Sequence, residues 1–233
     1  VLGVSLTPYR KAGFPMKKGK VSNAVIRRLP RYYGQLDSLY QVGVVRISSS
    51  ALGKAMNLTA SQIRQDLSCF GEFGQQGYGY NVESLRNEIS EILGMNQGHT
   101  AIILGAGNLG RALIQNFQFS QNGFRLTAAF DTDPAVVGKR VAGVPVYSID
   151  MLDEYLSQHP TSVGVLTVPQ SVALSTAQRL IAGGVKGLWN FTNIELGIRD
   201  KDVVVENVHF ADSLLALSYL ITPRDGESEA EAL

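Results

Sequence analysis

The stretch HTAIILGAGNLGRALI occupies residues 99–114 and decides the fold of the larger part of the chain. Its first six residues are typical of a buried strand, and three glycines follow at once in the spacing G-x-G-x-x-G, at Gly105, Gly107 and Gly110. A strand that ends in this turn and opens a helix predicts a Rossmann unit. We expect the first glycine to allow the turn, the second to admit a pyrophosphate, and the third to let helix and strand pack closely.

A carboxylate follows the next expected strand, 124–130. Asp131 lies 21 residues after Gly110, where a Rossmann unit places the acid that accepts hydrogen bonds from both ribose hydroxyls of an adenosine. Asp133 adds a second negative charge and no arginine follows directly, so a 2′-phosphate would be repelled. These residues indicate NAD(H) rather than NADP(H).

Short apolar runs alternate with helical patterns through the rest of the chain. We expect strands over 144–147, 163–168, 187–190 and 203–206, with helices over 149–157, 171–181 and 210–221. Such alternation predicts a parallel sheet with helices on its faces, and ligands bind at the carboxyl ends of its strands. The expected cofactor contacts are Gly105, Ala106, Gly107, Asn108, Leu109, Gly110, Asp131, Thr132, Thr167, Val168, Pro169, Asn190, Phe191 and Phe210.

The expected helix over 210–221 is apolar on more than one face. Leu214, Leu215 and Leu217 point in different directions from one helix, so it needs to be buried on several sides. A second copy of the chain offers such surroundings, which predicts a homodimer. The acidic segment after it is poor in core residues and is expected to be disordered.

Charge is divided between the two halves of the chain. Residues 1–80 hold eleven Lys or Arg against three acids, a formal charge of +8, whereas residues 81–233 hold ten against seventeen, or −7. A basic module joined to an acidic one predicts that the first meets a polyanion, most commonly DNA. A solvated basic face with a cationic tail would explain the same count.

The basic half has the pattern of a helix-turn-helix. We expect a helix over 22–42 capped by Ser22, a short strand at 46–47, a helix capped by Ser49 or Ser50, and a third helix over 60–70 capped by Thr59. Two short helices across a tight turn predict this motif, although the shape also occurs as a plain packing unit.

The segment 71–80 holds four glycines in its first nine positions, with aromatic residues between them. This composition is typical of a β-hairpin wing whose backbone amides lie close to phosphates. Together with the polar face of the third helix it predicts a winged-helix domain that reads double-stranded DNA. The expected DNA contacts are Arg31, Tyr32, Ser49, Ser50, Lys54, Ser61, Gln62, Arg64, Gln65, Ser68, Gly74, Gln75, Gln76 and Tyr78.

The composition excludes several classes of protein. An apolar fraction of 45% with 18% charged residues is that of an ordinary globular protein, and no segment approaches the roughly 18 apolar residues of a membrane span. Residues 1–20 lack the apolar core of a secretory signal. The single cysteine, Cys69, fits a reducing cytoplasm, and we expect it to be a small buried hydrophobe rather than a redox sensor.

Hydride-transfer chemistry is not expected. A dehydrogenase needs a substrate pocket and a proton donor near the nicotinamide, but His99 and His159 precede strands and so lie at the remote edge of the sheet. Only His209 follows an element that could reach the site. A bound nucleotide would then act as a signal and no metal is expected. Two alternatives remain open: an NAD-dependent oxidoreductase with a basic appendage, and a module that binds CoA or another nucleotide.

The two modules together resemble the Rex family of redox-sensing repressors. The resemblance covers residues 22–220 and rests on the following motifs: RLPRYY (28–33), SSSAL (48–52), QIRQDLS (62–68), FGEFG (70–74), GYGY (77–80), GAGNLGRA (105–112), AFD (129–131) and VENV (205–208). It implies a homodimer that exchanges its C-terminal helices, a palindromic operator, and release of DNA by NADH. Family members often have Lys-Arg where this chain has Gln75-Gln76, Lys for Gln65, an aromatic for Asn116 and Asp for His209.

The expected domain order follows from these modules. It is a disordered arm over 1–21, a winged-helix DNA-binding domain over 22–80, a Rossmann domain over 81–207, an exchanged helix over 208–222 and an acidic tail over 223–233.

Overall fold

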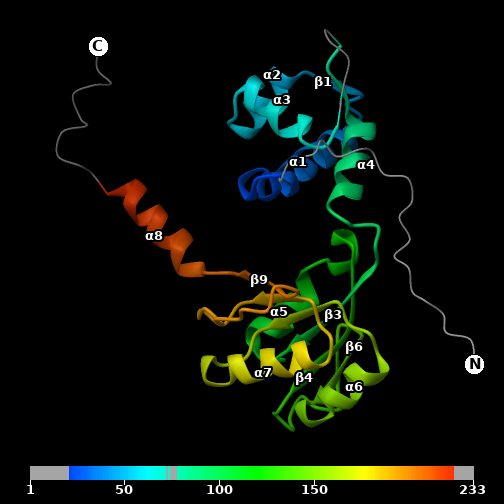
Figure 1. Cartoon of the computed structure of the whole chain (residues 1–233), viewed down its shortest axis with the longest axis vertical. Helices are drawn as coiled ribbons and strands as arrows, with labels where there is room; N and C mark the ends of the chain where they lie inside the picture. Colours follow the sequence, from blue (N-terminus) through cyan, green and yellow to red (C-terminus); the bar gives the residue numbers. More distant parts are fainter. Residues whose placement is uncertain (1–20, 72, 74–77, 223–233) are drawn as a thin grey trace, which may run out of the picture. The chain divides into compact units, whose positions relative to one another are not determined.

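The computed structural model describes residues 21–71, 73 and 78–222. The chain forms two compact units, which meet in sequence between Asn96 and Gln97 (Figure 1). The expected arm and acidic tail, and the tip of the expected wing, lie outside the described residues.

The N-terminal unit is a helix-turn-helix flanked by two further helices. Its elements are α1 (Asn23–Gln41), β1 (Arg46–Ile47), α2 (Ser49–Met56), α3 (Ala60–Ser68), β2 (Tyr80–Asn81) and α4 (Val82–Ile92). Asn57 adopts a left-handed conformation, with φ 55°, in the turn between α2 and α3. The two short strands pair antiparallel at the base of the segment expected to form the wing.

Two of the observed helix N-caps are the residues predicted from the sequence, and a third is a different residue. The Ser22 side chain accepts a hydrogen bond from the Val25 amide, and Thr59 accepts one from the Gln62 amide. The cap of α2 was expected at Ser49 or Ser50 and is instead Ser48, whose Oγ accepts from the Ala51 amide at 3.0 Å. Three consecutive serines are equally good cap residues, so the sequence did not distinguish them.

Helix α4 belongs to the N-terminal unit, because its buried residues Val82, Leu85 and Ile89 join the core formed by α1, α2 and α3. The expected boundary after Tyr80 would have placed this helix with the Rossmann domain. Arg86 of α4 also contacts α1 through an ion pair and a cation–π contact. Its Nε lies 2.6 Å from Asp37 Oδ1, and its guanidinium lies 5.0 Å from the centre of the Tyr40 ring. The boundary between the two units therefore lies after α4, between Asn96 and Gln97.

The C-terminal unit is a Rossmann fold, as predicted. Its elements are β3 (His99–Leu104), α5 (Asn108–Asn116), β4 (Phe124–Asp131), β5 (Arg140–Val141), β6 (Val144–Ser148), α6 (Leu152–Gln158), β7 (Val163–Leu166), α7 (Gln170–Ala182), β8 (Gly187–Asn190), β9 (Val204–Asn207) and α8 (Phe210–Ile221), with 3-10 turns at Phe119–Asn122 and Ile149–Met151. The strand order is β5-β6-β4-β3-β7-β8-β9, and only β5 pairs antiparallel. The order reverses at β3, between β4 and β7, which places the ligand crevice there.

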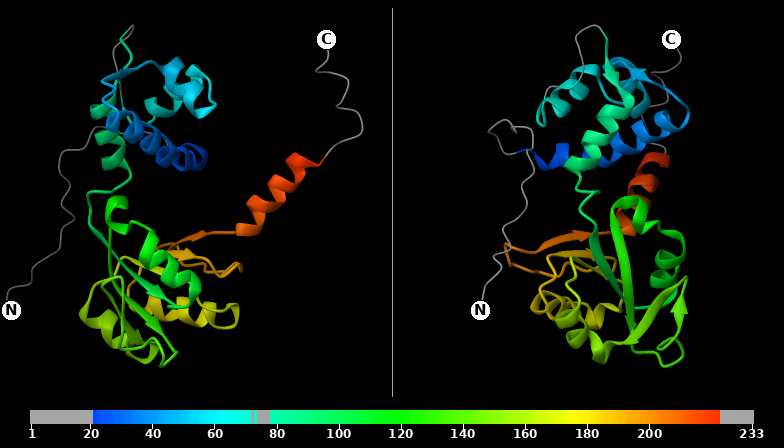
Figure 2. Two further views of the ribbon diagram at one scale, coloured as in Figure 1. Left: turned by 180° about the vertical axis from the view of Figure 1, so that it is seen from behind. Right: turned by 90° about the vertical axis from the view of Figure 1, so that its right-hand side faces the viewer.

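Helices lie on both faces of this sheet (Figure 2), and apolar side chains are buried between the helices and the strands. On one face Leu152 of α6 and Leu180 of α7 pack on Ile102 and Phe130 of the central strands. On the other, Ile114 of α5 packs with Ile103. Both faces are thus buried, as a parallel sheet requires.

The last helix, α8, has no buried residue. Leu214, Leu215 and Leu220 are 67%, 67% and 77% exposed, which is unusual for leucines on a helix. Among the described residues, none of the helices combines the length and apolar character that crossing a bilayer requires.

Candidate nucleotide-binding and DNA-binding sites

The glycine turn after β3 has the geometry that its spacing predicts. Gly105 has φ 97°, and a Cβ there would lie 2.6 Å from the carbonyl oxygen of Thr167. A Cβ on Gly110 would collide with the carbonyl oxygen of Gly105, whereas one on Gly107 would meet nothing within 4 Å. Gly105 and Gly110 are therefore required by the fold, and Gly107 leaves open space in front of the α5 N-terminus.

Asp131 is held against this turn by backbone hydrogen bonds. Its Oδ2 accepts from the Ala106 amide at 2.5 Å and its Oδ1 from the Asp133 amide at 2.9 Å. A carboxylate oxygen has two lone pairs, so each still has acceptor capacity. Asp131 can therefore accept from vicinal hydroxyls beside the glycine turn.

The end of β7 closes the other side of the crevice. Thr167 Oγ1 lies within hydrogen-bond distance of the carbonyl oxygens of Leu104 (3.0 Å) and Gly105 (2.8 Å). The hydroxyl thereby ties β7 to the glycine turn at the point where the strand order reverses.

A cavity of about 600 Å³ opens between these elements. Seven of the expected cofactor contacts line it: Gly105, Gly107, Asp131, Thr132, Thr167, Val168 and Pro169. Six further residues line it that the sequence did not single out: Phe130, Ile149, Val172, Ser175, Thr176 and Arg179. The last four lie on α7 at spacings of three, one and three, the pattern of one helix face, which is the signal that could have found them.

Arg179 enters this cavity in a fixed position. Its Nη2 donates to Asp153 Oδ2 at 2.9 Å and to the carbonyl oxygen of Ile149 at 3.1 Å. Its charge is therefore already neutralised by α6, and it is no candidate partner for a 2′-phosphate beside Asp131.

Asn190 is a correction to the expected cofactor contacts. Its side chain is 1% exposed, and its Nδ2 donates at 2.8 Å both to the carbonyl oxygen of Ile194 and to Asn207 Oδ1. Its Oδ1 accepts from Thr192. A buried amide must find partners inside the protein, and here it joins β8 to β9 and to the loop between them instead of facing a ligand.

Two aromatic rings connect the sheet to the start of α8. Phe191, directly after β8, and Phe210, the first residue of α8, have ring centres 6.0 Å apart. His209 precedes Phe210, and its Nε2 lies 3.2 Å from Glu195 Oε1. His209 stands where members of the resembled family often have Asp, and here it faces Glu195 of the same unit.

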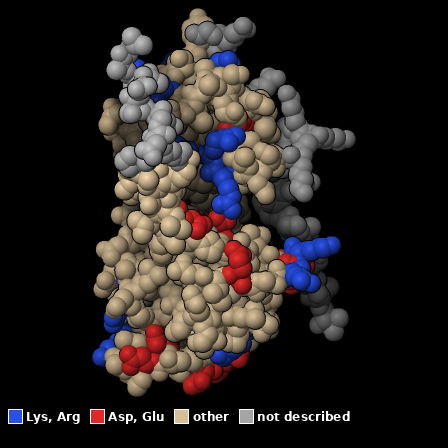
Figure 3. Space-filling model, turned by 90° about the vertical axis from the view of Figure 1, so that its left-hand side faces the viewer, with Lys and Arg blue, Asp and Glu red and all other residues tan. Residues whose placement is uncertain are grey.

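The N-terminal unit exposes polar side chains on its helix-turn-helix. Arg64 of α3 donates to Ser49 Oγ at 2.9 Å, and Arg31 of α1 donates to the carbonyl oxygen of Met56 at 3.4 Å. Most of the other expected DNA contacts on these helices are exposed: Ser50, Lys54, Ser61, Gln65 and Ser68. Lys and Arg side chains gather over this unit on the face drawn in Figure 3.

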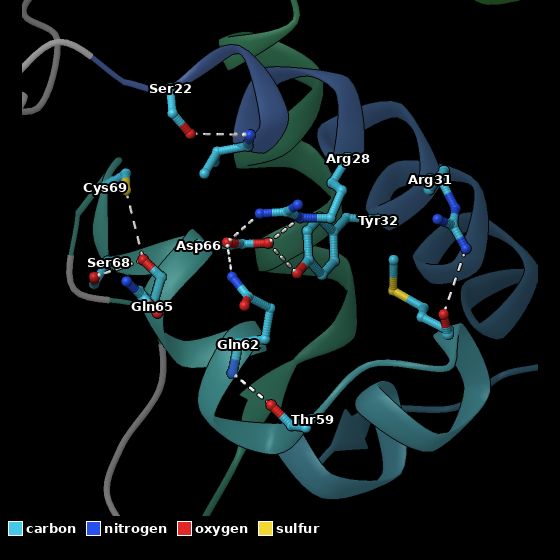
Figure 4. Close-up of polar contacts among 12 residues, drawn as sticks. Ser22, Arg28, Arg31, Tyr32, Thr59, Gln62, Gln65, Asp66, Ser68 and Cys69 are labelled. Carbon is cyan, nitrogen blue, oxygen red and sulfur yellow. Dashed lines mark hydrogen bonds and ion pairs between the residues drawn. The ribbon is translucent and has the colours of Figure 1, made fainter.

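Tyr32 is a second correction. Its ring is fully buried, and its hydroxyl donates to Asp66 Oδ2 at 2.8 Å, so it cannot reach DNA (Figure 4). It lies three residues after Leu29 and four before Leu36, on the buried stripe of α1. Gly74, Gln75 and Gln76 lie outside the described residues, whereas Tyr78 is 70% exposed.

Arg46 was not among the expected contacts. It lies on β1 at the base of the expected wing, is exposed, and donates to the Tyr78 carbonyl oxygen at 3.5 Å, with its guanidinium 5.9 Å from the Tyr78 ring centre. Its pairing with Asn81 brings it beside the expected wing, a neighbour relationship that the local sequence does not reveal.

Asp66 is a charged residue in the core of this unit. It is fully buried and forms an ion pair with Arg28, whose Nε lies 2.6 Å away. Burial would raise the pKa of the Asp66 carboxyl, but hydrogen bonds from Arg28, Tyr32 and Gln62 outweigh that effect and hold the pKa below its usual value. Burial and the neighbouring Asp66 raise the pKa of the Tyr32 hydroxyl.

Comparison with known families agrees with this division of the chain. A family described as "Putative DNA-binding protein N-terminus" matches residues 20–68, and the "CoA binding domain" family matches residues 96–194.

Curated relatives match almost the whole chain. The Redox-sensing transcriptional repressor Rex of Clostridium botulinum strain Hall is 49% identical over 205 residues, which are 88% of this chain and 97% of the relative. The same-named protein of Thermoanaerobacter pseudethanolicus is 46% identical over 209 residues, 90% and 93% of the two chains.

Solved structures of related proteins are similar to this chain in fold as well as in sequence. RSP in complex with β-NAD+ and operator DNA has a TM-score of 0.82 at 46% identity, with 87% of this chain and 93% of that chain covered. RSP in complex with β-NADH has a TM-score of 0.80 at 43% identity, with 87% and 95% covered.

Proposed function

The chain belongs to the Rex family of redox-sensing transcriptional repressors, and we propose that it is a homodimeric repressor whose affinity for a palindromic operator depends on the NADH/NAD+ balance. The observation that carries the proposal is the presence, in one chain, of an exposed helix-turn-helix and of a glycine turn facing a cavity with Asp131 at its edge.

The residues around the cavity fit NAD(H). The open space at Gly107 and the α5 N-terminus suit a pyrophosphate, Asp131 suits the hydroxyls of an unphosphorylated ribose, and Ile149 and Val172 offer apolar walls. When bound, the nicotinamide supplies a ring that is charged when oxidised and neutral when reduced. The nucleotide is a signal and no substrate is turned over, as in the family, whose members are repressors and not enzymes.

The DNA-reading surface comprises α3 and its surroundings. We assign base-edge contacts to exposed side chains of α3 and phosphate contacts to Arg31, Arg46 and Lys54. None of these three cations, nor Arg64, forms an ion pair with a described carboxylate, so their charges are free to meet phosphates. Because its operator is genomic DNA, we place the protein in the cytoplasm.

Helix α8 is the proposed dimer segment. Its apolar side chains are uncovered within the described chain, and a helix of this kind is stable only when a partner buries it. Exchange of α8 between two copies would bring Phe210 and His209 of each chain beside the other subunit.

The proposed regulation is a linkage between two ligands. If NADH favours one arrangement of the dimer and DNA another, each must weaken the other by the same factor, and a tenfold effect needs about 1.4 kcal/mol of differential binding. Fluorescence anisotropy of a labelled palindromic duplex, titrated with the protein plus NADH or plus NAD+, tests this. We expect weaker binding with NADH. Equal affinity under both conditions would disprove redox sensing while leaving DNA binding intact.

A further inference from the structure

The buried carboxylate of Asp66 lies under the exposed surface of the recognition helix α3 (Figure 4). It occupies the inner face of the helix, in line with Ile63 and Leu67, where an apolar residue would pack without cost. Removing a carboxylate from water destabilises the folded state unless an ion pair or hydrogen bonds compensate for the lost water. Asp66 therefore needs partners inside the unit.

Four hydrogen bonds converge on this carboxylate. Arg28 donates Nε to Oδ2 at 2.6 Å and Nη2 to Oδ1 at 2.9 Å. Tyr32 donates its hydroxyl to Oδ2 at 2.8 Å, and Gln62 donates Nε2 to Oδ1 at 2.7 Å. Arg28 and Tyr32 anchor Asp66 to α1, so Gln62, one turn earlier on α3, is bound to a group that is itself fixed.

An ionised carboxylate can only accept hydrogen bonds, so the amide nitrogen of Gln62 must face it and the carbonyl oxygen must face elsewhere. Gln62 is half-buried, next to the exposed Ser61 and one turn before the buried Asp66, at the border of the exposed face of α3. By contrast, no side-chain hydrogen bond orients the exposed amide of Gln65 within the described chain.

We propose that Asp66 is a positioning residue for sequence recognition: it orients the Gln62 amide so that Oε1 accepts a hydrogen bond from the exocyclic amino group of an operator base. This inference rests on the proposed DNA-binding function and names a determinant of its specificity.

The orientation selects bases by their chemistry. In the major groove the amino donors are N6 of adenine and N4 of cytosine, whereas guanine and thymine present acceptors. The second amide hydrogen of Gln62 remains available for N7 of a purine, so adenine, which offers both groups, is the preferred base. An amide free to flip would discriminate less between donors and acceptors.

The test uses the full chain in four forms: wild type, Gln62→Leu, Asp66→Asn and, as a matched control, Asp37→Asn. The control removes the same charge from another ion pair of the same unit, since Asp37 pairs with Arg86 at 2.6 Å, away from α3. Each protein selects duplexes from a randomised pool. Anisotropy then measures affinity for the selected duplex and for every single-base-pair change in it.

We expect Gln62→Leu and Asp66→Asn to flatten the base preference at the same position of each half-site. The loss is about tenfold in discrimination, or about 1.4 kcal/mol. Preferences elsewhere and the salt dependence stay unchanged, and Asp37→Asn keeps the wild-type profile. A base analogue that lacks the exocyclic amino group, placed at this position, weakens the wild type tenfold and leaves Gln62→Leu unaffected.

Wild-type base preference in folded Asp66→Asn overturns the proposal, as does a wild type that tolerates the amino-deleted analogue at the position that responds to Gln62→Leu. Thermal unfolding shows whether Asp66→Asn folds. If Asp66→Asn does not fold, the amino-deleted analogue provides the test. An equal loss of affinity for the analogue-containing duplex in the wild type and in Gln62→Leu would exclude a hydrogen bond from the base amino group to Gln62 Oε1. A wild-type protein that selects no duplex at all contradicts DNA binding itself, and the proposal with it.

Discussion

The Asp131 carboxylate and the Ala106 amide are joined by a 2.5 Å hydrogen bond, which ties the end of β4 to the glycine turn after β3. The bond fixes the carboxylate where an adenosine ribose would lie. Asp131→Ala removes a charged acceptor for two hydroxyls, and each such hydrogen bond contributes about 1.5–3 kcal/mol. We therefore expect affinity for NADH, measured by calorimetry, to fall at least tenfold.

Asp133→Ala is the matched control for this change, because Asp133 is exposed, lies two residues further along the chain and does not line the cavity. It should alter NADH affinity little. Titration with CoA separates the remaining alternative: a CoA-binding module would bind CoA, and Asp131→Ala would leave that affinity intact. Unchanged NADH binding by Asp131→Ala would remove the nucleotide assignment.

The glycine turn predicts two substitutions with opposite consequences. Gly110→Ala forces a Cβ onto the Gly105 carbonyl oxygen, so we expect it to destabilise the unit by about 1–3 kcal/mol and to lower the melting temperature. In Gly107→Ala the new methyl group meets nothing within 4 Å of the protein, so stability is kept while the space for a pyrophosphate is filled. Differential scanning fluorimetry with and without NADH distinguishes the two, and a Gly107→Ala protein stabilised by NADH as strongly as the wild type would refute the placement.

Periodicity and glycine spacing predicted the Rossmann sheet, the helix-turn-helix and seven of the cavity residues, because those features are local or follow from the order of elements. What was missed depends on distant contacts. Arg179 enters the cavity from α7 through its pairing with Asp153, and Tyr32 turns inward to Asp66, 34 residues away. The partners in these contacts have no local signal, although the positions do: Tyr32 lies on the buried stripe of α1, and Arg179 lies on the face of α7 that also holds Val172.

Helix α8 provides a test of the dimer. Leu214 and Leu220 are exposed within the chain, so Leu214→Glu with Leu220→Glu should leave the monomer fold intact and place charges in the proposed interface. We expect sedimentation to show a monomer with at least tenfold weaker operator binding. Ser213→Glu with Ser218→Glu adds the same charges at exposed polar positions of the same helix, and should disturb the dimer less. A dimer that survives the leucine changes would mean that α8 is not the interface.

The Asp66 network predicts a pH window for stability. The folded-state pKa of Asp66 is below the ordinary 3.8, so its contribution is present above pH 3.8 and is lost as pH falls below it. The folded-state pKa of Tyr32 is above 10.0, so its contribution is present below pH 10.0 and is lost as pH rises beyond it. Between these limits Asp66→Asn should cost about 2–3 kcal/mol in urea unfolding.

This cost should shrink as pH falls below 3.8, because the carboxyl of the unfolded wild type is then protonated while the folded one is still ionised, which favours unfolding of the wild type. A difference between wild type and Asp66→Asn that stayed constant down to pH 2 would show that the charge of Asp66 contributes nothing to folding.

Arg46 lies at the base of the expected wing, and this position predicts that its side chain contacts a DNA phosphate and not a base edge. A cation that neutralises one phosphate releases one counterion, so Arg46→Ala should weaken operator and random DNA about equally and reduce the salt slope by roughly 1. Arg125→Ala is the control, since Arg125 is an exposed cation of the Rossmann unit and should change neither quantity. If Arg46→Ala instead weakened the operator alone, with an unchanged salt slope, Arg46 would be reading a base, and the division between α3 as reader and the wing base as anchor would be wrong.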